Sequence, residues 1–208
     1  EQWSLLNYGQ GDGFDDTDIF APEAWKIRST SPNVVVAVID SGIDYNHEDL
    51  KNNIWKNNDE IPNNGIDDDS NGYIDDYLGW DFYYNDNNPH PYSVSNIHGT
   101  HVAGIIGAEG NNGIGVAGVT WDVQLMNLKV FSDYSSTSRG VWDAIRYAAD
   151  NGADIINLSL GASIGSAIYE GGFHSSGTFE DYKKLLPADY NGYYSALKYA
   201  TDKGCTII

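Results

Sequence analysis

The chain has 208 residues, which is enough to bury the core of one sizeable domain and marginal for two. Its 30 acidic and 11 basic residues give a formal net charge of −19. Proteins bind nucleic acid mainly through lysine and arginine on phosphates, so this charge argues against a nucleic-acid partner and against docking on an anionic membrane. No apolar run approaches the length of about 18 residues that a membrane helix needs. The single cysteine, Cys205, excludes an internal disulfide.

The first half of the chain predicts one short helix, one buried strand and long loops. Residues 22–27 suit a short helix, because a proline is favoured in the first helical turn. Residues 34–39 form a continuous apolar, β-branched run, which is typical of a strand buried on both faces. Residues 51–97 are rich in Asn, Asp, Gly and Tyr and predict long ordered loops, which in a compact domain usually serve a function.

The second half alternates helical and strand patterns. Helices are expected at 98–109, 141–149 and 194–201, and strands at 123–131, 153–160 and from 205 to the last residue. Strands that alternate with helices indicate an α/β fold with right-handed crossovers. The sequence therefore predicts a three-layer sandwich around a mostly parallel sheet, in one domain spanning 1–208.

Three short motifs lie where such a sheet places its ligands, at or beyond the carboxyl ends of strands. Asp40 follows the first buried strand directly, and His98 opens a helix after a long loop. The run Ser159-Leu160-Gly161 leaves the strand at 153–160. Taken singly, each has a structural explanation: a turn that ends a strand, a histidine at a helix start, and a strand end.

Taken together, the motifs resemble those of one enzyme family. Asp40-Ser41-Gly42, then His-Gly-Thr-His-Val-Ala-Gly at 98–104, then Asn-Leu-Ser-Leu-Gly at 157–161 resemble, in this order, the subtilisin-like serine peptidases (subtilases, peptidase family S8). The resemblance runs from about Trp3 to Ile208 and implies a subtilisin-like fold and peptide hydrolysis by an Asp-His-Ser triad.

The resemblance also implies a role for each motif. Asp40 would be the carboxylate that orients the imidazole, and His98 the general acid and base, so the two side chains are expected within hydrogen-bond reach. Ser159, Leu160 and Gly161 would pair with the backbone of the bound substrate, and Leu160 would line a side-chain pocket.

The family's nucleophile has no counterpart in this sequence. Subtilases carry the serine in a Gly-Thr-Ser helix start, and the asparagine that binds the oxyanion follows the preceding strand; no Gly-Thr-Ser occurs here. Residues 1–208 are therefore expected to be the N-terminal two-thirds of a peptidase domain, incomplete at the C-terminus and inactive alone. Residues 162–190 are longer and more polar than is usual for the family and predict a surface insertion.

The acidic residues cluster, which favours a cation site over an evenly charged surface. Between residues 49 and 86 ten acidic residues stand against two lysines, so this window carries −8 of the charge of −19. Residues 67–76 place oxygen-bearing groups at alternate positions with glycine at the sixth, like the first half of an EF-hand loop. Oxygen ligands without His or Cys favour calcium, although a solvated acidic loop is the simpler alternative. The candidate ligands of this loop, 59–76, are Glu60, Asp67, Asp69, Asn71, Tyr73 through its carbonyl, and Asp75 or Asp76.

The resemblance implies a second calcium site with a different ligand set. Subtilases wrap one ion with an aspartate that follows the catalytic strand and with an Asn-Asn-x-Ile-Gly-Val loop. The matching residues are Asp49 and Asn112 by side chain and Ile114 and Val116 by carbonyl, with Gln2 as a further candidate.

The family also sets the expected surroundings of the protein. A subtilase of this kind is secreted, is stabilised by structural calcium, cleaves protein or peptide substrates and carries an N-terminal propeptide in its precursor. The chain starts at Glu1 without an apolar signal segment, so a processed form or a fragment is expected. Two alternatives are an inactive pseudo-protease that keeps the cleft to bind peptides, and a calcium-binding structural module. The second would account for residues 59–76 but not for Asp40 and His98.

Overall fold

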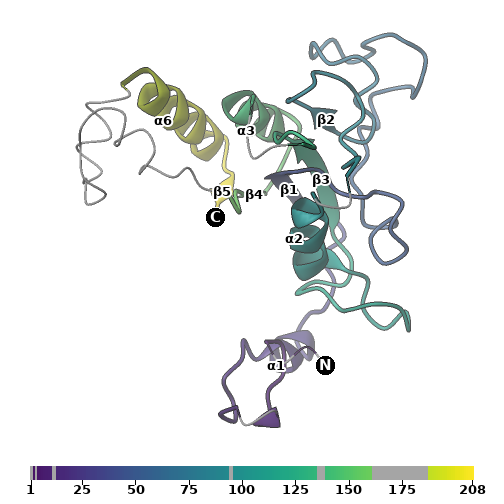
Figure 1. Ribbon diagram of the computed structural model, residues 1–208, viewed down its shortest axis with the longest axis vertical. Helices are drawn as coiled ribbons and strands as arrows, with labels where there is room; N and C mark the ends of the chain where they lie inside the picture. The colour runs from purple at the N-terminus through teal and green to yellow at the C-terminus, as the bar shows by residue number, and fades with distance from the viewer. Residues whose placement is uncertain (1, 3, 11–12, 94–95, 135–138, 161–186) are drawn as a thin grey trace.

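A five-stranded parallel sheet forms the centre of the computed structural model (Figure 1). The structure describes all residues except 1, 3, 11–12, 94–95, 135–138 and 161–186, and leaves out the side chains of 187–190. The sheet order is β2-β3-β1-β4-β5, and every neighbouring pair is parallel, as predicted. The strands are β1 (Val35–Asp40), β2 (Trp80–Asp81), β3 (Gln124–Lys129), β4 (Ile155–Asn157) and β5 (Thr206–Ile207).

Helices cover both faces of the sheet, which confirms the three-layer α/β architecture (Figure 1). On one face α3 (Val141–Asp150) packs against α6 (Pro187–Asp202), and on the other face lies α2 (His98–Gly107). The short α1 (Ala21–Trp25) lies beyond α2, at the opposite end of the molecule from α6. None of the helices in the described part of the chain has the length and apolar content of a membrane span.

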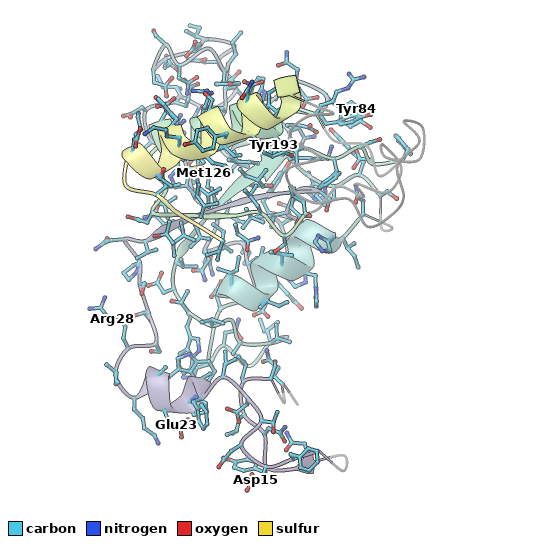
Figure 2. The ribbon with its side chains drawn as sticks, turned by 90° about the vertical axis from the view of Figure 1, so that its left-hand side faces the viewer. Asp15, Glu23, Arg28, Tyr84, Met126 and Tyr193 are labelled. Carbon is cyan, nitrogen blue, oxygen red and sulfur yellow. The ribbon has the colours of Figure 1, made fainter. Side chains whose placement is uncertain are left out.

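The central strand β1 is buried along its whole length, because each face of the sheet has its own hydrophobic cluster. Ala37 and Ile39 face the cluster of α3 and α6, while Val36 and Val38 face the cluster of α2. In β3, Met126 is fully buried in the middle of the molecule (Figure 2). The continuous apolar pattern therefore reflects a strand covered on both faces.

Three sequence expectations were inaccurate. The region 51–97 contains β2, a strand of two residues that is too short to show a periodic pattern. The helix expected at 194–201 begins earlier, at Pro187, so the predicted insertion at 162–190 overlaps α6 and otherwise lies outside the described residues. The strand expected at 153–160 is limited to β4, because only these three residues pair with β1.

Candidate active site

The end of β1 and the start of α2 bring Asp40 and His98 together. Both Asp40 carboxylate oxygens accept from Nδ1 of His98, at 2.8 and 2.9 Å. Asp40 is buried, with 1 % of its surface exposed, whereas the His98 side chain is 58 % exposed. Because an ionised carboxylate can only accept, Nδ1 carries the proton and Nε2 keeps a lone pair. That lone pair is available to a hydroxyl group at the surface.

Two small residues hold this pair in place. The Ser41 N–H donates to Asp40 Oδ1 at 2.6 Å, and Ser41 Oγ accepts from the N–H of Gly99 at 2.9 Å. A Cβ on Gly99 would lie 2.5 Å from the Gly42 carbonyl oxygen and 3.1 Å from Asp40 Cβ. Glycine at this position therefore allows α2 to begin directly against the end of β1, and this close approach places His98 beside Asp40.

The second histidine of the motif lies elsewhere. His101 is exposed, one turn further along α2, and lines a cavity of about 830 Å³ together with His47, His90 and Ile105. Neither Asp40 nor His98 lines this cavity. His101 is therefore a suitable control for experiments on His98.

The residues expected to bind substrate follow β4 at the same edge of the sheet. Asn157 pairs with Val38 in the register of β4 and β1, so Ser159 and Asp40 each lie two residues beyond that pair. Ser159 is exposed and its hydroxyl donates to Asn157 Oδ1 at 3.3 Å, while Leu160 is half-buried against the core. Gly161 lies outside the described residues.

A buried lysine beside this pair escaped the sequence analysis. Lys129, at the end of β3, is fully buried, and its Nζ lies 2.7 Å from Asp81 Oδ2 and 3.4 Å from Asp133 Oδ2. Nζ also lies 4.4 Å from the centre of the Tyr84 ring. Burial raises the pKa of the Asp81 carboxyl, while the Lys129 bond and backbone N–H groups oppose that rise. The only sequence signal was a lysine within the otherwise largely apolar run at 123–131.

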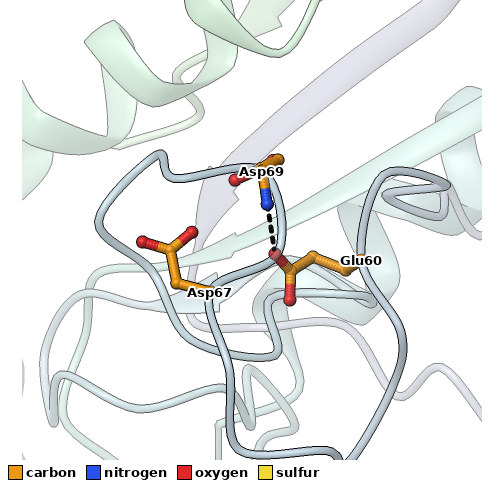
Figure 3. A group of neighbouring side chains, drawn as sticks. All are labelled: Glu60, Asp67 and Asp69. Atoms are coloured by element: carbon orange, nitrogen blue, oxygen red, sulfur yellow. Dashed lines mark hydrogen bonds between the residues drawn. The ribbon is translucent and has the colours of Figure 1, made fainter.

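In the acidic loop, three of the predicted ligands converge (Figure 3). Ligand oxygens of Glu60, Asp67 and Asp69 all lie within 4.8 Å of one another. Glu60 is buried, and its Oε1 accepts from the N–H groups of Asp68 and Asp69 at 2.8 and 3.3 Å. Burial, with nearby Asp76 and Asp69 adding to it, raises the pKa of Glu60.

The other predicted ligands of this loop have different partners. The Asn71 N–H donates to both Asp67 and Asp69 at 3.0 Å, so this residue stays beside the three carboxylates. Both Asp75 oxygens accept backbone N–H groups at the start of the loop. Asp76 is buried and accepts from the Tyr147 hydroxyl of α3.

Tyr73 links the loop to the core through its ring. The ring packs edge-on against Trp80, Phe82 and Tyr147, with centroids 5.1 to 5.5 Å apart. The sequence predicts Tyr73 only as a ligand through its main-chain carbonyl. The ring contacts are a second role, which fixes the position of the loop against β2 and α3.

The donor set of the loop fits a hard divalent cation. Glu60, Asp67 and Asp69 offer only carboxylate oxygens, and no lysine or arginine of the described residues forms an ion pair with them. Glu60 is buried and the two aspartates are half-buried, and a buried carboxylate without a counter-charge costs free energy that a bound cation would offset. Calcium, with its preference for carboxylate and carbonyl oxygens, matches this set.

The structure also gathers the residues of the second expected calcium site. Asp49, 1 % exposed, accepts from Asn112 Nδ2 at 2.8 Å and from the Val116 N–H at 2.9 Å. The Ile114 N–H donates to Asn112 Oδ1, and the Gln2 amide bonds to the main chain of the neighbouring residue 117. Both Asp49 oxygens accept N–H groups, as do the carboxylate oxygens of the three converging residues in the acidic loop.

Comparison with known proteins identifies the family. The model of the subtilase family, Peptidase S8, matches residues 31–208. The chain belongs to the subtilase family. Among curated subtilases and related proteases, subtilisin-like protease 1 of Plasmodium vivax is 45% identical over 127 residues, which are 60% of this chain and 20% of that protein. The thermophilic serine proteinase of Bacillus sp. (strain AK1) is 36% identical over 155 residues, 74% of this chain and 32% of that protein.

A solved structure supports the same fold. The crystal structure of the Aeromonas sobria serine protease in complex with the chaperone ORF2 matches with a TM-score of 0.59 and 25% identity. The match covers 79% of this chain and 25% of that chain. The halolysin-like extracellular serine protease Nep of Natrialba magadii is 37% identical over 139 residues, 66% of this chain and 22% of that protein. This subtilase chain thus spans about a fifth to a third of the length of these relatives.

Proposed function

We propose that this chain supplies the aspartate and histidine of an Asp-His-Ser triad in a secreted, calcium-binding serine endopeptidase. The contact of both Asp40 oxygens with His98 Nδ1 is the observation that carries the proposal. A buried carboxylate on Nδ1 fixes the tautomer in which Nε2 can take a proton. The extracellular serine protease Nep among the relatives supports secretion, and the subtilase family supports the reaction type.

The chemistry of the two residues follows from this geometry. His98 Nε2 takes the proton of an attacking serine hydroxyl, and the imidazolium that forms is stabilised by the adjacent Asp40 carboxylate. His98 then returns the proton to the leaving amine. No Gly-Thr-Ser occurs in these 208 residues, so the proposal assigns the serine to another part of the protein.

The segment that follows β4 would hold the substrate. Ser159 is exposed beside the end of β1, and an extended peptide can add as a further strand there, with main-chain bonds giving broad affinity. The half-buried Leu160 would contribute an apolar wall to a side-chain pocket. This arrangement suits protein or peptide substrates, and an N-terminal propeptide in the precursor is the further partner that membership of the subtilase family implies.

Covalent labelling of the full-length protein tests the catalytic proposal. A phosphonofluoridate reacts with a serine only when a neighbouring imidazole activates the hydroxyl. We expect the wild-type protein to be labelled, His98→Ala to lose labelling, and His101→Ala, one turn along α2, to keep it. Labelling that survives in His98→Ala would refute the catalytic role, and an unlabelled wild-type protein would favour the pseudo-protease.

We also propose that residues 59–76 bind calcium as a structural cofactor. Glu60, Asp67 and Asp69 provide converging carboxylates, and Asn71 lies beside them. Calcium would bind only the folded loop and would therefore raise the stability of the folded state by mass action.

A calcium titration of the thermal midpoint tests this assignment. We expect calcium to raise the midpoint of the 208-residue chain, and Asp69→Ala to remove most of the rise. Asp59→Asn is the matched control, because Asp59 is an exposed acid of the same window outside the converging group. An equal rise in Asp69→Ala and in the control would contradict the site.

A further inference from the structure

Three charged residues form one row across the sheet at the edge that carries the active site. In the strand register Asp81 pairs with Lys129, and Lys129 pairs with Asp40. Paired residues of neighbouring strands point to the same face and lie about 4.8 Å apart along the row. The flexible lysine therefore has a carboxylate on either side, and Asp40 is one of them.

The ammonium group binds the carboxylate away from the active site. Nζ of Lys129 donates to Asp81 Oδ2 at 2.7 Å and lies 3.4 Å from Asp133, while both Asp40 oxygens accept from His98. Lys129 and Asp81 are fully buried, so neither charge can turn to water instead. Burial therefore keeps Lys129 paired with Asp81, while Asp40 pairs with His98.

The lysine stem also contacts the turn that carries Asp40. A Cβ on Gly42 would lie 3.0 Å from Lys129 Cδ, so this glycine passes directly against the stem. The Val130 N–H, next along β3, donates to the Asp40 main-chain oxygen at 2.8 Å. A movement of the Lys129 side chain would therefore shift the turn that positions the Asp40 carboxylate.

We propose that Asp81 is a positioning residue for the Asp40–His98 pair: it binds the Lys129 ammonium and so keeps that ammonium away from the Asp40 carboxylate, whose two oxygens accept from the imidazole. Without the Asp81 charge, the ammonium keeps only the longer contact with Asp133, at 3.4 Å, and turns along the row towards Asp40, where it competes with His98 for the carboxylate. The role rests on the proposed function, in which Asp40 orients the catalytic histidine.

Asp81→Asn is the variant that isolates this role. Asp81 Oδ1 accepts from the N–H groups of Tyr83 and Tyr84, at 2.9 and 3.0 Å, and asparagine keeps that oxygen. The change replaces only the oxygen that faces Lys129 with an amide NH₂, which repels the ammonium. The double variant Asp81→Asn/Lys129→Met removes the competing ammonium while it keeps a stem of similar length.

Proton NMR of the full-length protein gives the readout, because an imidazole Nδ1–H bonded to a carboxylate resonates far downfield. His98→Ala assigns the signal by its disappearance. We expect the signal in the wild-type protein, its loss or upfield shift in Asp81→Asn, and its return in the double variant. Circular dichroism melting confirms that each variant is folded.

The outcomes separate this role from a purely structural one. If the ion pair only stabilised the fold, both variants would lose it and would behave alike, and that result would overturn the proposal. An unchanged signal in Asp81→Asn would overturn it as well. Absence of the signal from the wild-type protein would instead count against the Asp40–His98 pair and so against the proposed function.

Discussion

At the scale of single residues, one hydroxyl group ties the acidic loop to the helices behind the sheet. Tyr147 of α3 is buried and donates to Asp76 Oδ2 at 2.5 Å, and Asn57 and Asn71 donate to the same carboxylate. The carboxylate of Asp76 raises the pKa of Tyr147 further above its ordinary value, after burial as the main cause. Tyr147 therefore stays a neutral donor at every working pH.

Removal of this hydroxyl should destabilise the protein. In Tyr147→Phe the buried Asp76 carboxylate loses one of three donors, and we expect the free energy of unfolding to fall by about 1.5–3 kcal/mol. Urea unfolding measures the change. The control Tyr134→Phe, at a position that is 85% exposed, should stay within about 0.5 kcal/mol of wild type. Equal losses in the two variants would contradict the role of the Tyr147–Asp76 bond.

The contact between Asp40 and His98 could be predicted from sequence, whereas the contacts of the neighbouring Lys129 could not. Asp40 and His98 stand in short motifs at a strand end and a helix start, where the fold class already places functional groups. The pairing of Lys129 with Asp81 depends on the register between two strands about 50 residues apart in the chain. No local pattern encodes that register, so only the structure reveals the row of charges.

At the scale of elements, long helical patterns in the sequence allowed accurate prediction, whereas short or polar segments did not. Both α2 and α3 were predicted to within about two residues at each end; α3 has a clear apolar stripe, whereas α2 buries mainly small residues. The start of α6 was missed in a polar stretch that contains Gly192, an unfavourable residue within a helix. A Cβ at Gly192 would lie 2.6 Å from the Trp142 ring, so close packing against α3 explains the glycine.

The two-residue strand β2 depends on a close approach to β3. Gly79, just before β2, has φ +99°, and a Cβ there would lie 2.0 Å from the Asn127 carbonyl oxygen. Gly65 has φ +74° and no neighbour within 4 Å of an added Cβ. An alanine at Gly65 would therefore meet only the strain of a positive φ, whereas an alanine at Gly79 would meet that strain and a clash with β3.

Alanine substitutions at these positions should differ in cost. We expect Gly65→Ala to lower the free energy of unfolding by about 1 kcal/mol, the cost of a left-handed backbone conformation. Gly79→Ala should cost clearly more, because the main chain before β2 must also move away from β3. Urea unfolding of both variants gives the comparison, and equal losses would show that β2 does not need this close approach.

At the scale of the whole molecule, residues 49–86 carry −8 of the charge of −19, and the structure buries some of their carboxylates, among them Glu60 and Asp76. Burial raises the pKa of Glu60 and of Asp76 above the ordinary carboxyl value of about 4. Between the ordinary and the raised pKa, the folded chain holds more protons than the unfolded chain. Without a cation, the contribution of these two carboxyl groups to stability therefore falls as the pH rises through this window.

Calcium should reverse this dependence, because its ligands must be deprotonated to bind it. With a chelator present, we expect the thermal midpoint to fall as the pH rises from about 4 towards neutral, and Glu60→Gln to weaken that fall. With calcium present, the gain in midpoint over the chelated protein should grow over the same range. A calcium gain that is independent of pH would contradict the assignment of these carboxylates as ligands.

The central claim is that Asp40 orients His98 for catalysis, and the kcat/KM of Asp40→Asn tests it most directly. Asparagine keeps the size of the side chain but favours the wrong imidazole tautomer. For the full-length protein on a peptide substrate, we predict a fall in kcat/KM on the order of 10⁴-fold. A kcat/KM within about tenfold of wild type would correspond to a loss of less than about 1.4 kcal/mol of transition-state stabilisation. That result would contradict the proposed role of Asp40.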